Sequence, residues 1–107
     1  MKYALVINTD ETETVWNALR FGSAALSRGH EVSAFLLGPA VGIERISDER
    51  FDVQSLLLRF DELGGVALSC GTCLRLREMD AAAVCPMSTM DDLVRLTEDA
   101  DRVLTFG

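Results

Sequence analysis

The chain has 107 residues and a formal net charge of −7, from 17 acidic and 10 basic side chains. This acidic balance argues against nucleic acid as a partner, because affinity for DNA or RNA comes largely from Lys and Arg that neutralise phosphates. Hydrophobic residues make up 49% of the chain, but no apolar run approaches the ~18–20 residues that span a bilayer. We therefore expect one soluble, cytoplasmic domain over residues 1–107, with no membrane partner.

Strand-like and helical patterns alternate through the first third of the chain. Residues 3–8 form an apolar, β-rich run that predicts a first strand rather than a signal peptide. Asp10-Glu11-Thr12-Glu13 then has the form of a capping box, in which the first residue is the N-cap. The helix that follows carries an apolar stripe at helical spacing and should end before Gly29. Residues 31–37 predict a second strand, and Gly38–Gly42 a loop.

The middle of the chain predicts a second helix and a third strand. Residues 43–51 show no pattern stronger than a short helical turn. Asp52 is placed to cap the helix that follows, and Gly64-Gly65 should end it. Residues 66–69 then predict the third strand, and a short helix is expected from about Gly71 to Glu78.

The last third predicts one more strand, helix and strand. Residues 81–84 read as a short fourth strand that Cys85-Pro86 ends. Ser88, with Asp91 three residues on, is the expected start of the last helix. Residues 102–106 close the chain as a fifth strand. The apolar stripe of the last helix is Met90, Leu93, Val94 and Thr97.

Strands that alternate with helices imply a mostly parallel sheet whose two faces are both covered by helices. We therefore predict an α/β protein of the three-layer α/β/α class, with a five-stranded, mostly parallel sheet. The crossover rule favours right-handed connections in such a fold. The pattern does not determine the order of the strands in the sheet.

Ligands of open parallel sheets bind beyond the carboxyl ends of the strands, which sorts the candidate site residues. Cys70 follows the third predicted strand, Cys85 follows the fourth, and the loop with Gly38 and Pro39 follows the second. That loop is either a simple turn or a wall of the cysteine pocket, and Cys85 is either a core residue or a second thiol facing Cys70. His30 precedes a strand, so it should lie at the opposite edge and be a poor base for Cys70.

The segment Cys70-Gly71-Thr72-Cys73 is the most informative in the chain, because it predicts a thiol on a strand-to-helix turn. If Cys70 is the N-cap, backbone N–H groups of the turn point at its sulfur and lower the thiol pKa from ~8.5 toward neutrality. Such a thiolate attacks disulfides, polysulfides and persulfides. Cys73, one turn on, could then resolve a mixed disulfide or take over the sulfur. The alternative is that both are small buried residues without reactivity.

Other site chemistries find little support in the sequence. A structural zinc site needs four ligands, and three cysteines with a distant His30 do not supply them. No glycine-rich phosphate-binding motif is present. We therefore expect neither a metal nor an organic cofactor.

Residues 64–75, Gly-Gly-Val-Ala-Leu-Ser-Cys-Gly-Thr-Cys-Leu-Arg, resemble the cysteine motif of the DsrE/DsrF-like sulfur-relay family. Residues 18–38 resemble its first helix and second strand, and residues 88–106 its last helix and strand. The resemblance implies the three-layer fold and small cytoplasmic subunits that form trimers, hexamers or mixed complexes. It also implies a cysteine, here Cys70, that holds a persulfide in sulfur oxidation or tRNA thiolation. Cys73 matches a second cysteine that only some members have.

The functional hypothesis is a sulfurtransferase-like sulfur-relay protein that carries sulfane sulfur as a persulfide on Cys70. It would act as a homo-oligomer, with sulfur donor and acceptor proteins as further partners. Trp16 and Leu58 fall off the apolar stripes of their helices and are candidates for the oligomer interface. Two other readings stay open: a thiol–disulfide redox protein or sensor that uses Cys70 and Cys73, and a non-catalytic oligomeric binding module with inert thiols.

Overall fold

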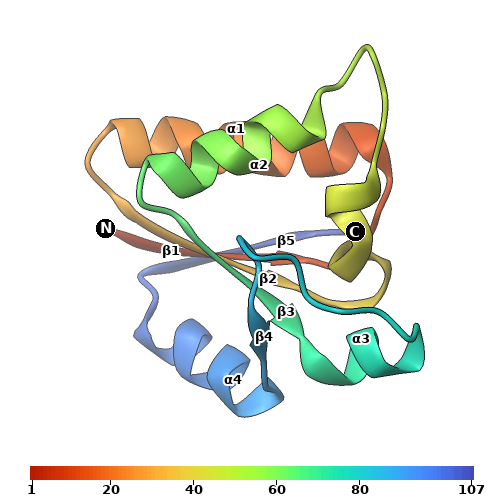
Figure 1. The fold of residues 1–107 in the computed structure, drawn as a ribbon. Helices are drawn as coiled ribbons and strands as arrows, with labels where there is room; N and C mark the ends of the chain where they lie inside the picture. The colour runs from red at the N-terminus through yellow and green to blue at the C-terminus, as the bar shows by residue number, and fades with distance from the viewer.

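A computed structural model describes all 107 residues and shows a five-stranded sheet with helices on both faces (Figure 1). Every pair of neighbouring strands is parallel, and the strand order is β4-β3-β2-β1-β5. The predicted α/β class with a parallel sheet is therefore confirmed. In chain order the elements are β1 (Lys2–Ile7), α1 (Thr12–Ser27), β2 (Glu31–Leu36), the 3-10 helix η1 (Gly38–Arg45), α2 (Val53–Glu62), β3 (Val66–Cys70), α3 (Gly71–Leu76), β4 (Met87–Ser88), α4 (Met90–Asp99) and β5 (Arg102–Phe106).

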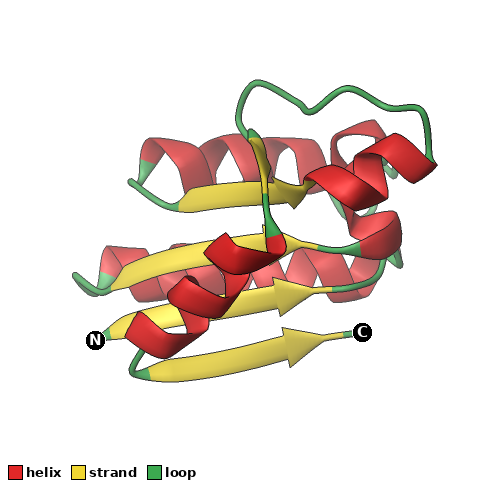
Figure 2. Ribbon diagram, turned by 90° about the horizontal axis from the view of Figure 1, so that it is seen from below, coloured by secondary structure: helices red, strands yellow, loops and turns green.

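The two helical layers differ in how well they cover the sheet. Helices α1 and α2 pack side by side on one face, and α3 and α4 lie on the other (Figure 1). The view from below shows α4 lying across the sheet, with no helix in front of β5 (Figure 2). The core therefore lies mainly between the sheet and the α1/α2 layer, and the face with α3 and α4 is more open. No helix combines the length and the hydropathy that crossing a membrane would need.

Phe60 is the centre of the packing between α1, α2 and the sheet, and two glycines make room for its ring. Its side chain is fully buried. A Cβ on Gly22 of α1 would lie 2.7 Å from Phe60 Cε2, and one on Gly65 would lie 2.5 Å from Phe60 Cζ. Side chains at these two positions would collide with the ring, because real Cβ atoms do not approach so closely.

The start and end of α1 follow from its capping residues. The N-cap is Glu11, not Asp10 as the capping box predicts, because the Glu11 carboxylate accepts bonds from the backbone N–H groups of Glu13 and Thr14, at 2.9 and 3.0 Å. A hydrogen bond from the Thr14 hydroxyl and these two N–H bonds lower the pKa of Glu11. At the other end, Gly29 has φ +86°, as predicted for the residue just beyond the helix.

The segment between β2 and α2 is more regular than its sequence predicts. Gly38–Gly42, expected to be a loop, belongs to the 3-10 helix η1. Pro39 favours this because its fixed φ suits the first turn of a helix, where its missing N–H is not needed. Asp52 caps α2 as predicted, accepting a hydrogen bond from the Ser55 N–H at 3.0 Å.

The predicted fourth strand at residues 81–84 is wrong. Residues 77–86 form an irregular link, and β4 consists only of Met87 and Ser88, which pair with Ser69 and Cys70 of β3. The edge of β3 sets this position, since Ser69 N–H bonds the carbonyl of Pro86 at 2.9 Å. Cys85 therefore precedes β4 instead of following a strand end.

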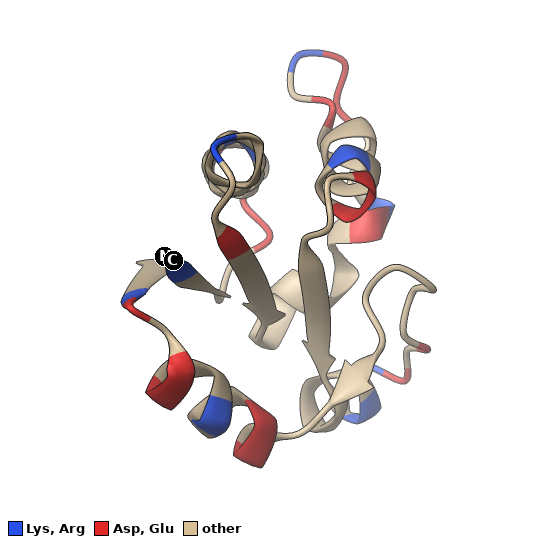
Figure 3. Cartoon of the chain, turned by 90° about the vertical axis from the view of Figure 1, so that its left-hand side faces the viewer, with Lys and Arg blue, Asp and Glu red and all other residues tan.

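Helix α4 begins one residue later than predicted and faces a different way. Its N-cap is Thr89, not Ser88, and the Ser88 hydroxyl instead donates to Asp92 Oδ2 at 2.7 Å. Met90 and Val94, predicted on the apolar stripe, are 55% and 50% exposed. The inner face is formed by Leu93 and Leu96, which pack against the core. Acidic residues occur at both ends of α4, with a basic residue between them (Figure 3).

Candidate functional site

Cys70 lies at the junction of a strand and a helix, as its sequence context predicts. It is the last residue of β3 and the N-cap of α3, and it is 3% exposed. No backbone N–H donates to its sulfur, so the expected bonds from Thr72 and Cys73 are not formed. Sulfur is a weak acceptor, and the Cys70 side chain instead packs with the hydrophobic core.

A cavity of about 360 Å³ opens beside this junction. The ends of β3 and β4 and the starts of α3 and α4 form its walls. Gly71 allows the close approach of β4, because a Cβ there would lie 3.0 Å from Met87 Cγ. The residues that line it are Cys70, Thr72, Cys73, Arg75, Met87, Ser88, Thr89 and Met90.

Cys73 also lines this cavity, and its sulfur accepts a hydrogen bond from the segment that follows β2. The Gly38 N–H, at the start of η1, donates to Cys73 Sγ at 3.2 Å. Gly38 has φ +55°, and a Cβ there would lie 2.5 Å from Asn8 Oδ1, so both conformation and space favour glycine. Gly38 therefore contacts Cys73, although it is not one of the residues that line the cysteine cavity.

Two arginines of the cysteine segment also contact its turn. Arg75 donates to the Thr72 hydroxyl at 3.3 Å, and Arg77 donates to the carbonyl of Cys73 at 3.3 Å. These contacts hold two positive charges next to the turn. Cys73 is half-buried, whereas Cys70 is almost fully buried. Of the two thiols, Cys73 is therefore the more accessible.

The other two predicted pocket residues lie elsewhere. Pro39 lines a neighbouring cleft between η1 and the link after α3 and is not part of the cysteine cavity. Cys85 lines neither. It is 1% exposed in the core, so the expectation that it faces Cys70 past a strand end is wrong, and the core interpretation is correct. Burial, with the negative charges of Glu44 and Asp61, raises the pKa of the Cys85 thiol to about 12.

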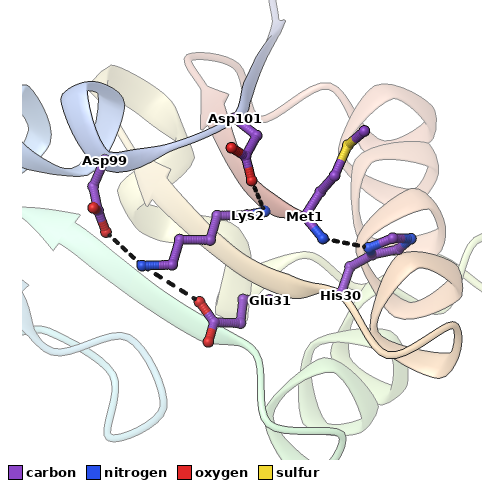
Figure 4. Close-up of polar contacts among 6 residues, drawn as sticks. All are labelled: Met1, Lys2, His30, Glu31, Asp99 and Asp101. Atoms are coloured by element: carbon purple, nitrogen blue, oxygen red, sulfur yellow. Dashed lines mark hydrogen bonds and ion pairs between the residues drawn. The ribbon is translucent and has the colours of Figure 1, made fainter.

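His30 lies at the opposite edge of the sheet, as predicted. Its Nδ1 lies 2.9 Å from the amino group of Met1 (Figure 4). Its ring packs edge-on against Tyr3. The same edge holds an ion pair between Lys2 and Asp99, at 3.1 Å (Figure 4). His30 therefore has a structural role at the chain start and is too far from the cavity to serve the cysteines as a base.

One wall of the cavity was not predicted from the sequence. Met87, Thr89 and Met90 line it, and their role depends on the position of β4. One feature of the sequence could have indicated this wall. Thr89 is a residue type favoured at N-caps, and it lies three positions before Asp92, whose N–H donates to its hydroxyl. All three cysteines are free thiols. No group of three or more His, Cys, Asp and Glu side chains is arranged to hold a metal ion.

The family model of the DsrE/DsrF-like family matches residues 1–106. The chain belongs to the DsrE/DsrF-like family. Its structure is similar to the crystal structure of the ychN protein from E. coli, with 24% identity, 99% of both chains covered and a TM-score of 0.85. It is also similar to the conserved protein of unknown function BT1422 from Bacteroides thetaiotaomicron, with 18% identity, 97% and 93% coverage and a TM-score of 0.77.

Both likenesses concern the DsrE/DsrF-like fold alone, because the identities are low. A comparison with curated proteins found no significant match. Any activity of this DsrE/DsrF-like chain must therefore be argued from its own cysteines and the cavity they line.

Cys85 should make the protein less stable at high pH. Its thiol has a pKa of about 12 in the folded state against 9.0 in the reference state, so between these values only the unfolded chain loses the proton. Over that range the free energy of unfolding of the wild type should fall with rising pH. The fall should be steeper than that of Cys85→Ala, by up to about 1.4 kcal/mol per pH unit. Urea unfolding of both proteins from about pH 8 to about pH 11 measures this. Parallel curves would show that Cys85 does not titrate as described.

Proposed function

We propose that this protein carries sulfane sulfur as a persulfide on Cys70 in a sulfur relay. The observation that carries the proposal is the placing of two free thiols, Cys70 and Cys73, in one cavity at the carboxyl edge of the sheet. Membership of the DsrE/DsrF-like family supports it, because the cysteine motif of that family resembles residues 64–75.

The loading step is an exchange of sulfur between thiols. The Cys70 thiolate attacks the outer sulfur of a donor persulfide or polysulfide, the S–S bond of the donor breaks, and the donor leaves as a thiolate. Cys70 is the N-cap of α3, although no backbone N–H of the turn donates to its sulfur in the structure. Arg75, on the cavity wall, adds positive charge. Because Cys70 is almost fully buried, its persulfide would be shielded from bulk solvent.

Cys73 has the second role in this proposal. It lies one turn after Cys70 in the same cavity and is more accessible. Its thiolate can take the outer sulfur from Cys70 and present it to an acceptor. Neither step changes the oxidation level of the transferred sulfur, so no metal or organic cofactor takes part.

A specific observation also favours thiol–disulfide exchange as a second candidate. Cys70 and Cys73 are both reduced and line the same cavity, so one oxidation could join them. Titration of the pair against a glutathione couple separates the two functions, because a defined two-electron potential with no bound sulfur favours redox chemistry. Thiols inert in both assays would favour the non-catalytic binding module.

Sulfur loading is tested by intact-mass analysis before and after incubation with polysulfide. The wild-type protein should gain the mass of sulfur, and Cys70→Ser should gain none, because the proposed acceptor is missing. Cys73→Ser should still load but release the sulfur to added thiol more slowly. Cys85→Ser is the matched control and should behave as wild type, since that thiol is buried outside the cavity. Equal loading of wild type and Cys70→Ser would refute the carrier role of Cys70.

We also propose that the protein acts as a homo-oligomer, a trimer or hexamer, in the cytoplasm, where its free thiols would stay reduced. The oligomer is supported by a group of exposed apolar side chains on the α3/α4 side: Leu76, Met87, Met90 and Val94. Trp16, by contrast, packs against Phe51 within the chain, with Arg20 over its ring. Sulfur donor and acceptor proteins would be further partners of the relay.

The assembly is tested by light scattering of the purified protein. The wild type should have the mass of a trimer or hexamer, and Val94→Glu should reduce it, because a charge would be buried at the interface. Leu58→Glu places the same charge on an exposed apolar site of the opposite layer and should leave the assembly intact. A monomeric wild type would contradict the proposed assembly. Disruption by Leu58→Glu but not by Val94→Glu would contradict the proposed location and indicate an interface on the α1/α2 layer.

A further inference from the structure

Three arginines near the cysteine segment have no acidic partner. No carboxylate oxygen lies within 4.0 Å of the side-chain nitrogens of Arg45, Arg75 or Arg77. Arg20, Arg28, Arg59 and Arg102 have no acidic partner either, so what distinguishes these three is that they lie close to the cysteines in a chain with 17 acidic and 10 basic side chains. Such a region attracts anions locally even when the whole protein is acidic.

Two of these arginines line a cleft of about 300 Å³ beside the cysteine cavity. Arg45 comes from η1 and Arg77 from the link that follows α3. Met79 closes the cleft against η1, where a Cβ on Gly42 would lie 3.2 Å from the Met79 methyl carbon. Asp10 also lines the cleft, so its carboxylate is the one negative charge that faces an incoming anion.

Cys73 lines the cysteine cavity and is in contact with residues that belong to or adjoin the arginine cleft. Its carbonyl accepts the hydrogen bond from Arg77, which lines the cleft, at 3.3 Å. Its sulfur accepts the N–H of Gly38 at 3.2 Å, and the next residue, Pro39, lines the cleft as well. The Cys73 side chain itself lines the cavity that it shares with Cys70. The arginine cleft is therefore linked to Cys73 through Arg77 and the Gly38-Pro39 segment, while the Cys73 thiol itself opens into the cysteine cavity.

We propose that the arginine cleft binds the carboxylate groups of a small thiol that accepts sulfur from Cys73. The proposal rests on the sulfur-carrier function and names its acceptor class: a low-molecular-weight thiol that bears carboxylates. Guanidinium groups match carboxylates in geometry and form strong, paired hydrogen bonds with them. The volume of the cleft is at the lower end of the range for small-molecule sites.

The transfer step balances without any oxidant or reductant. The thiolate of the acceptor attacks the outer sulfur of the Cys73 persulfide, and a new S–S bond forms on the acceptor. The S–S bond to Cys73 breaks, and its electron pair returns to Cys73 Sγ. The proton of the outer sulfur stays with it, so the products are the acceptor persulfide and the Cys73 thiolate. The Gly38 N–H, already directed at this sulfur, stabilises the leaving thiolate.

The test compares two acceptors and one pair of substitutions. Protein loaded with polysulfide is mixed with glutathione, which bears carboxylates, or with 2-mercaptoethanol, which is neutral, and the loss of bound sulfur is followed by intact mass. Arg45→Gln with Arg77→Gln should slow unloading by glutathione about tenfold and leave unloading by 2-mercaptoethanol unchanged. Asp10→Asn should speed unloading by glutathione, because it removes the opposing charge.

The matched control is Arg28→Gln with Arg59→Gln, which removes the same charge at exposed sites outside the cleft. It should leave both rates unchanged. Equal effects of the cleft variant on both acceptors, or no effect on either, would overturn the proposed cleft while leaving sulfur carriage intact. A wild-type protein that never loads sulfur would instead overturn the carrier function, and the proposed acceptor with it.

Discussion

The parallel pairing of β2 with β3 is the constraint on which the site depends. Because Leu36 lies beside Ser69 in this register, the segments that leave the two strands emerge at the same edge of the sheet. There the first N–H of η1, from Gly38, meets Cys73 Sγ at 3.2 Å. This contact joins η1, which contributes Arg45 to the arginine cleft, to α3, which contributes Cys73 to the cysteine cavity.

The three cysteines occupy three environments, and this difference gives the site its chemistry. Cys70 is buried at the strand-to-helix junction and lines a cavity, a setting suited to holding a reactive sulfur away from solvent. Cys73 is more accessible and has a backbone donor at its sulfur. Cys85 lies in the core, where the neutral thiol is strongly favoured. The three cysteines therefore differ in role: Cys70 is the proposed sulfur carrier, Cys73 is proposed to pass the sulfur to an acceptor, and Cys85 packs in the core.

Patterns within short stretches of the sequence were enough to predict the α/β fold and the position of Cys70 at a strand-to-helix turn. The apolar run before Cys70 and the cap at Asp52 depend on neighbouring residues only, so they can be read along the chain. The position of β4 could not be read in this way. A strand of two residues is held by the edge of β3 rather than by a pattern of its own, and residues 81–84 have the stronger apolar pattern.

The walls of the site depend on such tertiary contacts. Met87 and Met90 line the cavity because β4 pairs with the end of β3. Arg45 lines the cleft at the end of η1, which also includes the residues 38–42 that were predicted to form a loop. The two N-caps at Glu11 and Thr89 were each one residue from their predicted positions, since neighbouring oxygens compete for the same N–H groups. The sequence thus indicated which thiol is the candidate, whereas the residues around it could be identified only from the folded structure.

A crystal structure of the protein after a polysulfide soak tests the central claim most directly, because it locates the added sulfur. The account predicts extra density on Cys70 Sγ inside the cavity, with the contact between Gly38 and Cys73 preserved. Density on Cys85, or polysulfide-treated crystals in which Cys70 and Cys73 are both unmodified, would contradict it.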